Sequence, residues 1–270
     1  MIVGYQGVEG SYSEEALIQY FGKEQLTKNY NQFEDVFIAL EEGEIDYGVL
    51  PIENSTTGSI SENYDLLKKY EYYIVAEINV KVRHNLLGIE GATIENITQI
   101  FSHPQGFEQC AKYLKTLNAK HVAYHNTAIS AKYVKDTNDV QNAAIASNRA
   151  AEIYGLSILN SDISNVAQNV TRFIIISKIA TTAKESNKMT LLFEIPNTIG
   201  SLYSILNQFA KEKVNLLKIE SRPVGDGTFS YCFYIDIEGN MQNANIINAL
   251  KNIEEVTKDF RILGNYIKSS

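Results

Sequence analysis

Short apolar runs alternate with segments of helical periodicity up to about residue 178, and this alternation limits the available folds more than any other feature. The apolar run at residues 2–5 predicts a strand. Ser11, with Glu14 three residues later, predicts a capped helix that ends at Gly22. Similar pairs of strand and helix follow, up to a final strand at residues 173–177. Strands that alternate with helices in this way predict an α/β architecture with mainly parallel sheets.

The alternation restarts once, after a long β-prone stretch at residues 72–82. This restart predicts two α/β lobes, at about residues 1–78 and 80–160, with a cleft between them. Residues 161–178 are expected to cross back to the first lobe. Ligands of open α/β sheets bind beyond the carboxyl ends of the strands, so the cleft is the expected site.

A polar segment of mostly small residues, 179–188, predicts a linker, and the order of elements changes after it. The pattern over residues 189–268 is strand, helix, two strands, helix, strand, which is the ferredoxin-like βαββαβ arrangement. The expected elements are strands at 189–195, 216–221, 229–238 and 257–266 and helices at 201–211 and 244–253, with the turn Gly225-Asp226-Gly227 between the middle strands.

Composition excludes several classes of partner. The formal net charge is −8, and nucleic-acid binding needs a surplus of Lys and Arg that this chain lacks. Cys110 and Cys232 lie far apart, and no spacing typical of a metal site occurs. The glycines fit neither dinucleotide-binding nor P-loop motifs. The chain begins without a targeting pattern and has no apolar run of membrane-spanning length, so a cytoplasmic protein is expected.

Polar residues gather where predicted strands give way to helices. These junctions are residues 7–13, 51–59, 102–106 and 126–127. Hydroxyls, amides and helix N-termini together suit carboxylate ligands. Helix capping alone explains Ser11 or Thr127, and His103 fits helix-cap support better than catalysis. Capping explains the run at residues 54–57 less well, because one cap needs one side chain.

The segment at residues 162–173 is polar and ends with Thr171 and Arg172 just before an apolar strand. Arginine is scarce, with five in the chain, so each is a candidate anion clamp. An arginine beside a hydroxyl can hold an anion and donate a second hydrogen bond to it. Spacing alone equally allows Thr171 to be an ordinary strand residue and Arg172 a surface charge.

Five motifs in order resemble the prephenate dehydratase family. They are PIENS at 51–55, HNLLG at 84–88, SHPQ at 102–105, AAIAS at 143–147 and NVTRF at 169–173. The chain departs from the family pattern at Val8, Ser11 and Tyr12, where Pro, Thr and Phe are usual, and at Gly106-Phe107, where Ala-Leu is commoner. The resemblance covers nearly all of residues 1–178, which would form the catalytic domain.

The resemblance implies decarboxylating dehydration of prephenate to phenylpyruvate, a step of L-phenylalanine biosynthesis. It also implies a periplasmic-binding-protein-like catalytic domain, and no cofactor or metal. Thr171 would donate a hydrogen bond or proton to the departing hydroxyl, and Arg172 would clamp a carboxylate bidentately. The other implied substrate-binding residues are Ser11, Ser13, Asn54, Ser55, Thr56, His103, Gln105 and Phe173.

The C-terminal segment NLLKIESRP at 215–223 resembles the effector motif of the ACT domain, with GSL at 200–202 as its partner loop. The usual proline before Gly200 is missing. The resemblance implies allosteric control by phenylalanine and a homodimer or homotetramer formed through ACT domains, whereas Glu220 and Arg222 by themselves could be a surface ion pair. The implied effector-binding residues are Gly200, Ser201, Leu202, Asn215, Glu220, Ser221, Arg222 and Pro223.

Two other functions stay open. Arogenate dehydratase has the same chemistry on the transaminated substrate. A non-catalytic module that senses or binds a small anion would also have two α/β lobes around a polar cleft, because a fold does not determine a function.

Overall fold

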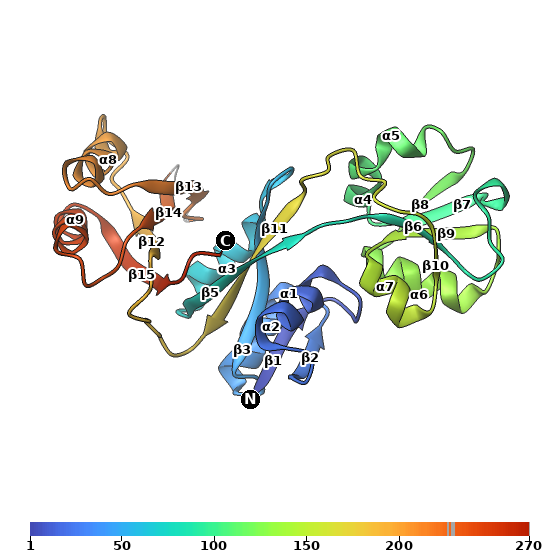
Figure 1. Cartoon of the computed structure of the whole chain (residues 1–270). Coiled ribbons are helices and arrows are strands. Elements are labelled where there is room, and N and C mark those ends of the chain that lie inside the picture. The colour runs from blue at the N-terminus through green and yellow to red at the C-terminus, as the bar shows by residue number, and fades with distance from the viewer. Residues whose placement is uncertain (226, 228–229, 270) are drawn as a thin grey trace.

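A computed structural model describes residues 1–225, 227 and 230–269. It contains three sheets, one for each lobe of the N-terminal region and one for the C-terminal domain (Figure 1). The first lobe lies between the other two parts. Among the described residues, no helix has the length and apolar character needed to cross a membrane.

The first lobe is a six-stranded mixed sheet between helices. Its strand order is β2 (Leu26–Tyr30), β1 (Ile2–Gln6), β3 (Tyr47–Asn54), β11 (Val170–Ser177) and β5 (Tyr73–Lys81), with β4 (Gly58–Ser59) paired to β3. α1 (Tyr12–Phe21) packs on one face of the sheet, and α2 (Phe33–Glu42) and α3 (Ser61–Lys69) pack on the other. Side chains of a strand alternate between faces, so Phe173 and Ile175 of β11 join the core with α1, whereas Ile174 and Ile176 join the core with α2 and α3.

The second lobe is built the same way. Its strand order is β10 (Ser157–Asn160), β6 (Asn85–Gly88), β9 (Asn142–Ala146), β7 (Gln99–Ser102) and β8 (Lys120–Ala123). Its helices are α4 (Pro104–Gln109), α5 (Ala111–Leu114), α6 (Thr127–Thr137) and α7 (Asn148–Tyr154), with the short 3₁₀ helix η1 (Ile94–Asn96). The chain crosses between the lobes at residues 82–84 and 161–169.

Both sheets are mixed, so the prediction of mainly parallel sheets is wrong in this respect. β11 runs antiparallel to β3 and β5, and β6 runs antiparallel to β9 and β10. The reason is that the crossings enter and leave through these strands. Pairing with β11 also extends β5 to Lys81, three residues beyond the expected end of the lobe segment at residue 78.

The C-terminal domain has the predicted βαββαβ order, and the predicted fold class is confirmed. Its elements are β12 (Lys188–Glu194), α8 (Ser201–Lys211), β13 (Leu216–Pro223), β14 (Tyr231–Glu238), α9 (Ala244–Glu254) and β15 (Lys258–Tyr266), and its sheet order is β13-β14-β12-β15. Asp226 of the expected turn and Phe229, the expected first residue of a strand, lie outside the described residues.

The C-terminal sheet is buried on both faces. Met189, Leu191 and Phe193 of β12 pack against α8 and α9. Leu192, together with Tyr234 of β14, points the other way and joins the core of the first lobe. The hydroxyl of Tyr234 donates a 2.5 Å hydrogen bond to the backbone carbonyl of Tyr64. The domain is therefore packed against the first lobe through one sheet face rather than tethered loosely to it.

Candidate active site in the cleft between the lobes

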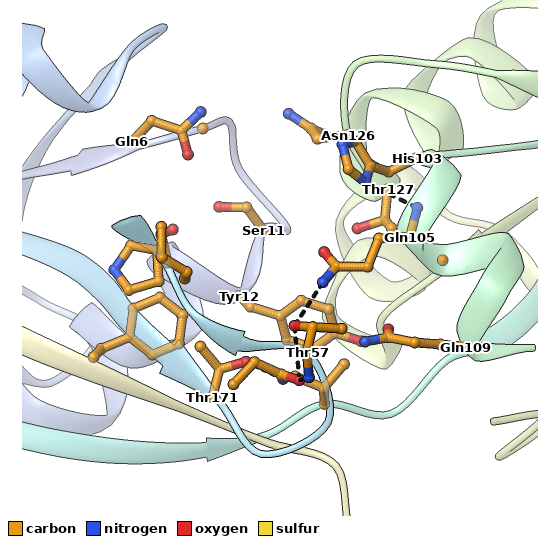
Figure 2. A pocket seen from close by; sticks show the side chains of 18 of the residues that line it. Gln6, Ser11, Tyr12, Thr57, His103, Gln105, Gln109, Asn126, Thr127 and Thr171 are labelled. Atoms are coloured by element: carbon orange, nitrogen blue, oxygen red, sulfur yellow. Dashed lines mark hydrogen bonds between the residues drawn. The ribbon is translucent and has the colours of Figure 1, made fainter. Parts of the chain in front are cut away.

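A cavity of about 440 Å³ lies between the two lobes, at the place where the predicted polar junctions meet. Side chains from α1, β3 and β11 of the first lobe face side chains from α4 and α6 of the second (Figure 2). The lining residues are Gln6, Gly7, Ser11, Tyr12, Ser13, Phe33, Pro51, Asn54, Thr57, Ile60, Val82, His84, His103, Gln105, Gly106, Gln109, His125, Asn126, Thr127, Thr171 and Phe173.

Thr171 and Asn54 form the centre of the cavity on the first lobe. They are paired across β11 and β3, and each is 8% exposed. Nδ2 of Asn54 donates a hydrogen bond of 2.9 Å to Oγ1 of Thr171. Because the hydroxyl oxygen accepts this bond, the hydroxyl proton of Thr171 is left to donate to a ligand in the cavity.

The turn after β3 fixes the orientation of the Asn54 amide. Oδ1 of Asn54 accepts hydrogen bonds from the backbone N–H groups of Thr56 and Thr57, at 2.9 and 3.1 Å. A backbone N–H can only donate, so the oxygen of the amide must face the turn and Nδ2 must face Thr171. The run of hydroxyl residues therefore positions the amide that positions Thr171.

Two glutamines of α4 reach across the cleft to that same turn. Nε2 of Gln105 donates to Oγ1 of Thr57 at 2.9 Å, and Nε2 of Gln109 lies 3.4 Å from Oγ1 of Thr56 (Figure 2). These bonds join the two lobes directly beside Thr171. The second lobe thus contributes to the same polar wall as the first.

A second set of contacts joins the lobes at the α1 side of the cleft. Arg149 of α7 makes a bidentate pair with Glu14 of α1, at 2.8 and 3.1 Å. Oγ of Ser147 donates to the carbonyl of Gly10 at 2.9 Å. Because φ of Gly10 is +85° and an added Cβ would lie 3.0 Å from Cα of Ala150, this close approach requires glycine.

The N-terminal residues of α1 and α6 line the cavity from opposite lobes; Ser11, Tyr12, Asn126 and Thr127 are labelled in Figure 2. Ser11 caps α1, where its Oγ accepts from the N–H of Glu14, and Asn126 caps α6, where its Oδ1 accepts from the N–H of Ile129 at 2.7 Å. Helix N-termini favour negative charge. They are well placed for two carboxylates on one ligand.

His84 lies at the crossing between the lobes, at residues 82–84, and contacts the wall of the cleft. Its Nε2 lies 2.7 Å from Oε1 of Gln109, which can only accept, so Nε2 carries the proton of the neutral ring. Nδ1 faces the hydroxyl of Tyr12 at 3.3 Å, and that hydroxyl lies 2.6 Å from the carbonyl of Arg83. Burial lowers the pKa of His84, and the bond to Gln109 opposes this effect. Burial also lowers the pKa of His103.

The cavity wall holds no Asp, Glu, Lys or Arg among its described lining residues. Its titratable side chains are three histidines and Tyr12, and burial raises the pKa of Tyr12. No cluster of His, Cys, Asp and Glu suited to a metal ion occurs in the described parts of the chain. The wall can therefore offer hydrogen bonds and oriented dipoles, and its histidines are its only ordinary acid–base groups among the described lining residues.

The cavity brings together seven of the residues predicted at the site. These are Ser11, Ser13, Asn54, His103, Gln105, Thr171 and Phe173. Ser55 and Thr56 lie in the turn behind Asn54, where Oγ of Ser55 accepts from the N–H of Val170 at 2.9 Å. Ser55 and Thr56 therefore support the cavity wall from behind and do not line it.

Arg172 requires a correction. Its side chain points away from the cavity, toward the C-terminal domain, and pairs with Glu53, Glu77 and Asp236 at 3.0–3.1 Å. Consecutive residues of a strand point to opposite faces, so Thr171 and Arg172 cannot both face the cleft. The prediction that Arg172 clamps a substrate carboxylate is therefore wrong.

The predicted effector residues lie at two places in the C-terminal domain. Gly200 is the N-cap of α8, which Ser201 and Leu202 begin. Oε2 of Glu220 accepts a 2.5 Å hydrogen bond from Ser59, and Arg222 makes a bidentate pair with Asp65, so both β13 side chains contact the first lobe. Asn215 precedes β13, and Ser221 and Pro223 lie on it.

Gln109, Thr57 and His84 are site residues that the sequence reasoning did not assign. A signal for Gln109 exists, because it follows Gln105 by four residues on a helix and so shares its face. Thr57 continues the hydroxyl run after Asn54. His84 opens the HNLLG motif, but its spacing does not assign it to the cavity, since its position depends on the crossing at residues 82–84 that joins the lobes.

Comparisons with known proteins agree with this geometry. The family model described as prephenate dehydratase matches residues 3–181, and the ACT domain model matches residues 189–255. An Arabidopsis thaliana protein named arogenate dehydratase/prephenate dehydratase 1 is 39% identical over 280 residues, covering 98% of this chain and 71% of that protein.

Two solved structures are similar over nearly their whole length. Prephenate dehydratase from Arthrobacter aurescens in complex with L-Phe has a TM-score of 0.91 and 28% identity, covering 99% of this chain and 90% of that one. A structure described as GqqA, a novel type of quorum quenching acylase, has a TM-score of 0.91 and 32% identity, covering 100% and 98%. The resemblance found in the motifs is confirmed: this chain belongs to the prephenate dehydratase family and carries a C-terminal ACT domain.

Proposed function

We propose that this chain converts prephenate to phenylpyruvate by decarboxylating dehydration, and that Thr171 is the catalytic residue. The observation that carries this proposal is the Thr171 hydroxyl, held by Asn54 with its proton directed to a cavity between the lobes. The family, which includes relatives named for this activity, supports the choice of reaction.

The chemistry needs help for a leaving group more than it needs a strong acid or base. The bond from the ring to its carboxylate breaks as carbon dioxide leaves, and that electron pair completes the aromatic ring. The ring hydroxyl departs with its bonding pair, and one proton is taken up to form water. Thr171 donates a hydrogen bond to this oxygen, where negative charge develops. Asn54 in turn donates to Thr171 and stabilises charge on its oxygen.

The substrate carboxylates are held without arginine in this proposal. The N-termini of α1 and α6 face each other across the cavity, and Gln105 and Ser13 add neutral donors. Preorganised dipoles of this kind stabilise anions in a site with little water. Phe173 and Pro51 supply apolar walls for the ring.

The same wall favours prephenate over arogenate. Arogenate carries an ammonium group where prephenate has a ketone, and an ammonium group is best paired with a carboxylate. The described cavity lining contains no Asp or Glu. His84 contacts Tyr12 and Gln109, and Nδ1 of His103 accepts from the N–H of Gln105. Among the described residues, no serine is hydrogen-bonded to a histidine of the cavity in the way an acylase would need.

The test supplies prephenate to the purified protein and measures phenylpyruvate by its absorbance in alkali. In a parallel reaction arogenate is supplied, and its product, phenylalanine, is quantified by amino-acid analysis, because this substrate yields no phenylpyruvate. We expect phenylpyruvate from prephenate and a lower kcat/KM for arogenate. Absence of product from prephenate would remove the proposal, and a higher kcat/KM on arogenate would replace it with arogenate dehydratase.

Regulation by phenylalanine is the second part of the proposal. Phenylalanine would bind near the start of α8 and β13, between the ACT domains of two subunits. The subunits would form a dimer or tetramer through these domains. The A. aurescens relative was solved with L-Phe, which supports the ligand. β13 lies at the edge of the described ACT sheet, where a second chain can pair.

Calorimetry with phenylalanine tests this regulation. Arg222 is already paired with Asp65, so effector binding there has to compete with an interdomain contact. We expect phenylalanine to bind the wild-type chain and to bind Arg222→Ala more weakly. Equal binding to both proteins, or no binding to either, would contradict the proposed effector site.

A further inference from the structure

The strands that carry the proposed catalytic pair also face the ACT domain. Antiparallel β3 and β11 pair Asn54 with Thr171 and, at the adjacent position, Glu53 with Arg172. Asn54 and Thr171 point into the cavity, whereas Glu53 and Arg172 point to the opposite face. One pair of neighbouring backbones therefore positions both the site and this second pair.

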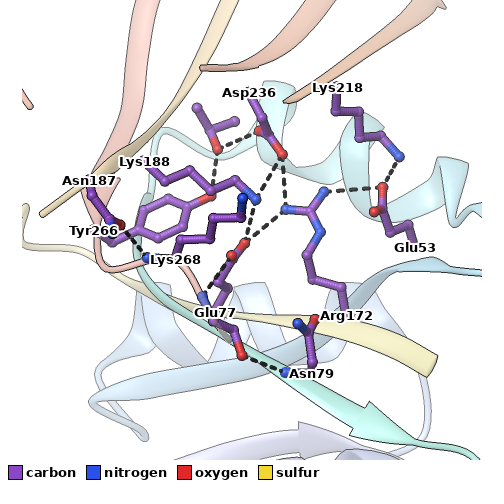
Figure 3. Close-up of polar contacts among 12 residues, drawn as sticks. Glu53, Glu77, Asn79, Arg172, Asn187, Lys188, Lys218, Asp236, Tyr266 and Lys268 are labelled. Carbon is purple, nitrogen blue, oxygen red and sulfur yellow. Dashed lines mark hydrogen bonds and ion pairs between the residues drawn. The ribbon is translucent and has the colours of Figure 1, made fainter. Parts of the chain in front are cut away.

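Arg172 lies among carboxylates from both domains (Figure 3). Its guanidinium is 3.1 Å from Glu53 and 3.0 Å from Glu77 of the first lobe, and 3.0 Å from Asp236 of the ACT domain. Lys188 of the ACT domain lies 2.7 Å from Glu77 and 3.2 Å from Asp236. The side chains of Arg172, Lys188, Glu77 and Asp236 are all at most 10% exposed.

Lys218 of β13 completes this group through an ion pair with Glu53 (Figure 3). We call these six residues, Glu53, Glu77, Arg172, Lys188, Lys218 and Asp236, the interdomain charge cluster. Its three cations and three anions balance. Burial by itself would lower the pKa of Arg172, but the negative charge of Asp236 and Glu53 raises it, so the guanidinium stays charged.

The cluster restricts where its central side chain, the guanidinium of Arg172, can lie. Nη1 of Arg172 donates a 3.0 Å hydrogen bond to Oε2 of Glu77, and Glu53 and Asp236 lie at ion-pair distance from the same guanidinium, so three carboxylates restrict its position. Its backbone lies next to that of Thr171. A shift of the ACT domain moves Asp236 and Lys188, and because the Arg172 side chain is only 10% exposed, it has little room to change rotamer, so part of the shift is passed to β11.

We propose that Arg172 is a positioning residue for the reaction: through the interdomain charge cluster it ties β11 and β3 to the ACT domain, and so holds Thr171 and Asn54 in their productive geometry. This inference rests on the proposed function. Docking of the ACT domain then sets kcat, and an effector that changes the docking acts on Thr171 through Arg172.

Other contacts between the domains provide a comparison. Lys68 of α3 pairs with Glu194 of β12 at 2.7 Å, and both side chains are 23% exposed. This ion pair also joins the ACT domain to the first lobe, but it involves neither β3 nor β11. If interdomain ion pairs act only by stabilising the assembly, removing this pair and disturbing the cluster should have similar effects on catalysis.

The test is a double-mutant cycle on kcat in the full-length chain without phenylalanine. Asp236→Asn keeps the size of the side chain and the oxygen that accepts from Thr190, but removes the charge opposite Arg172. We expect it to lower kcat for prephenate by about tenfold, with KM within about threefold of wild type. In a Thr171→Ala background, we expect the same change to alter kcat by less than about twofold. The control Glu194→Gln is expected to stay within about twofold of wild type.

The outcomes separate the two proposals. Equal factors for Asp236→Asn in both backgrounds, or an unchanged kcat in the wild-type background, would overturn the positioning role. A wild-type chain that makes no phenylpyruvate would instead remove the proposed function. If Asp236→Asn does not fold by circular dichroism, Glu53→Gln serves in the same cycle, because this side chain is 31% exposed and its loss is better tolerated.

Discussion

Nδ2 of Asn54 donates a hydrogen bond of 2.9 Å to Oγ1 of Thr171, and the two residues are paired across antiparallel β3 and β11. This bond decides what the hydroxyl can do. With its oxygen occupied as an acceptor, the hydroxyl of Thr171 is prepared to donate its proton into the cavity. The rest of the site serves to hold this arrangement or to hold the substrate against it.

Removal of the Thr171 hydroxyl should lower kcat strongly. For Thr171→Ala we expect a fall of about 10²–10⁴-fold, the span typical of a positioned donor, and Thr171→Ser should retain more activity than the alanine variant. Thr27→Ala, at an exposed position of β2 in the same sheet, is the matched control and should keep wild-type kcat. With folding verified by circular dichroism, a loss in Thr171→Ala of less than about tenfold would contradict the catalytic role.

Asn54→Asp tests the direction of the hydrogen bond. The carboxylate can still accept from the N–H groups of Thr56 and Thr57, so the turn should keep its shape. It cannot donate to Thr171, and it would accept the proton of Thr171 instead of leaving it for substrate. We expect kcat to fall by about tenfold or more. The thermal midpoint should fall as well, because Nδ2 of Asn54 also donates to Oδ1 of Asn169 and to the carbonyl of Val170, and a buried carboxylate would lose both bonds. Steady-state kinetics and calorimetry measure the two quantities, and unchanged kcat would show that the orientation of Thr171 does not matter.

The fold could be predicted from the sequence because local signals and tertiary structure agree. Alternating strands and helices, caps such as Ser11 and stops such as Gly22 mark most elements where the structure has them. The antiparallel direction of β11 could not be predicted in this way. A strand buried on both faces has the same apolar pattern in either direction, and its partners are distant in sequence.

The site was harder to predict than the fold, and Arg172 shows why. The motif places Thr171 and Arg172 together, which suggested a shared role toward substrate. The alternation of a strand already forbids it, since neighbours face opposite ways. What occupies the other face, a second domain with Asp236 and Lys188, depends on docking that no local pattern specifies.

Acid should destabilise the folded chain partly through His84. Burial holds its pKa below the ordinary value of 6.5, so the unfolded chain takes up this proton first as pH falls. The stability contributed by the neutral ring is fully present above pH 6.5 and is lost as pH falls through 6.5 toward the lower value of the folded state. For one such group the slope is at most about 1.4 kcal/mol per pH unit.

The measurement is the free energy of unfolding in urea, from pH 8 to pH 5, for wild type and His84→Gln. We expect the variant to lose less stability than wild type over this range, while His103, whose pKa burial also lowers, keeps part of the slope in both proteins. The difference at pH 8 gives the cost of the substitution itself. Parallel curves over the whole range would mean that His84 does not titrate as its burial requires.

At Gly264 the backbone of the ACT domain lies close to the backbone of the first lobe. A Cβ at this position of β15 would lie 2.0 Å from the carbonyl oxygen of Ile74 in β5. Backbone cannot rotate away as a side chain can, so Gly264→Ala must separate the two domains or displace β5. We expect a loss of about 1–3 kcal/mol or more, seen by calorimetry as a lower thermal midpoint.

Gly4→Ala is the matched control for this prediction. Its added Cβ would meet the terminal Cδ1 of Ile45 at 2.4 Å, inside the first lobe, and a terminal methyl group can turn aside at small cost. Gly264→Ala should therefore lower the thermal midpoint more than Gly4→Ala does. Because β5 is paired with β11 at Ile74 and Ile176, a displaced β5 also disturbs the strand that carries Thr171, so kcat should fall in Gly264→Ala. A chain with wild-type midpoint and wild-type kcat would contradict the close packing of β15 on β5.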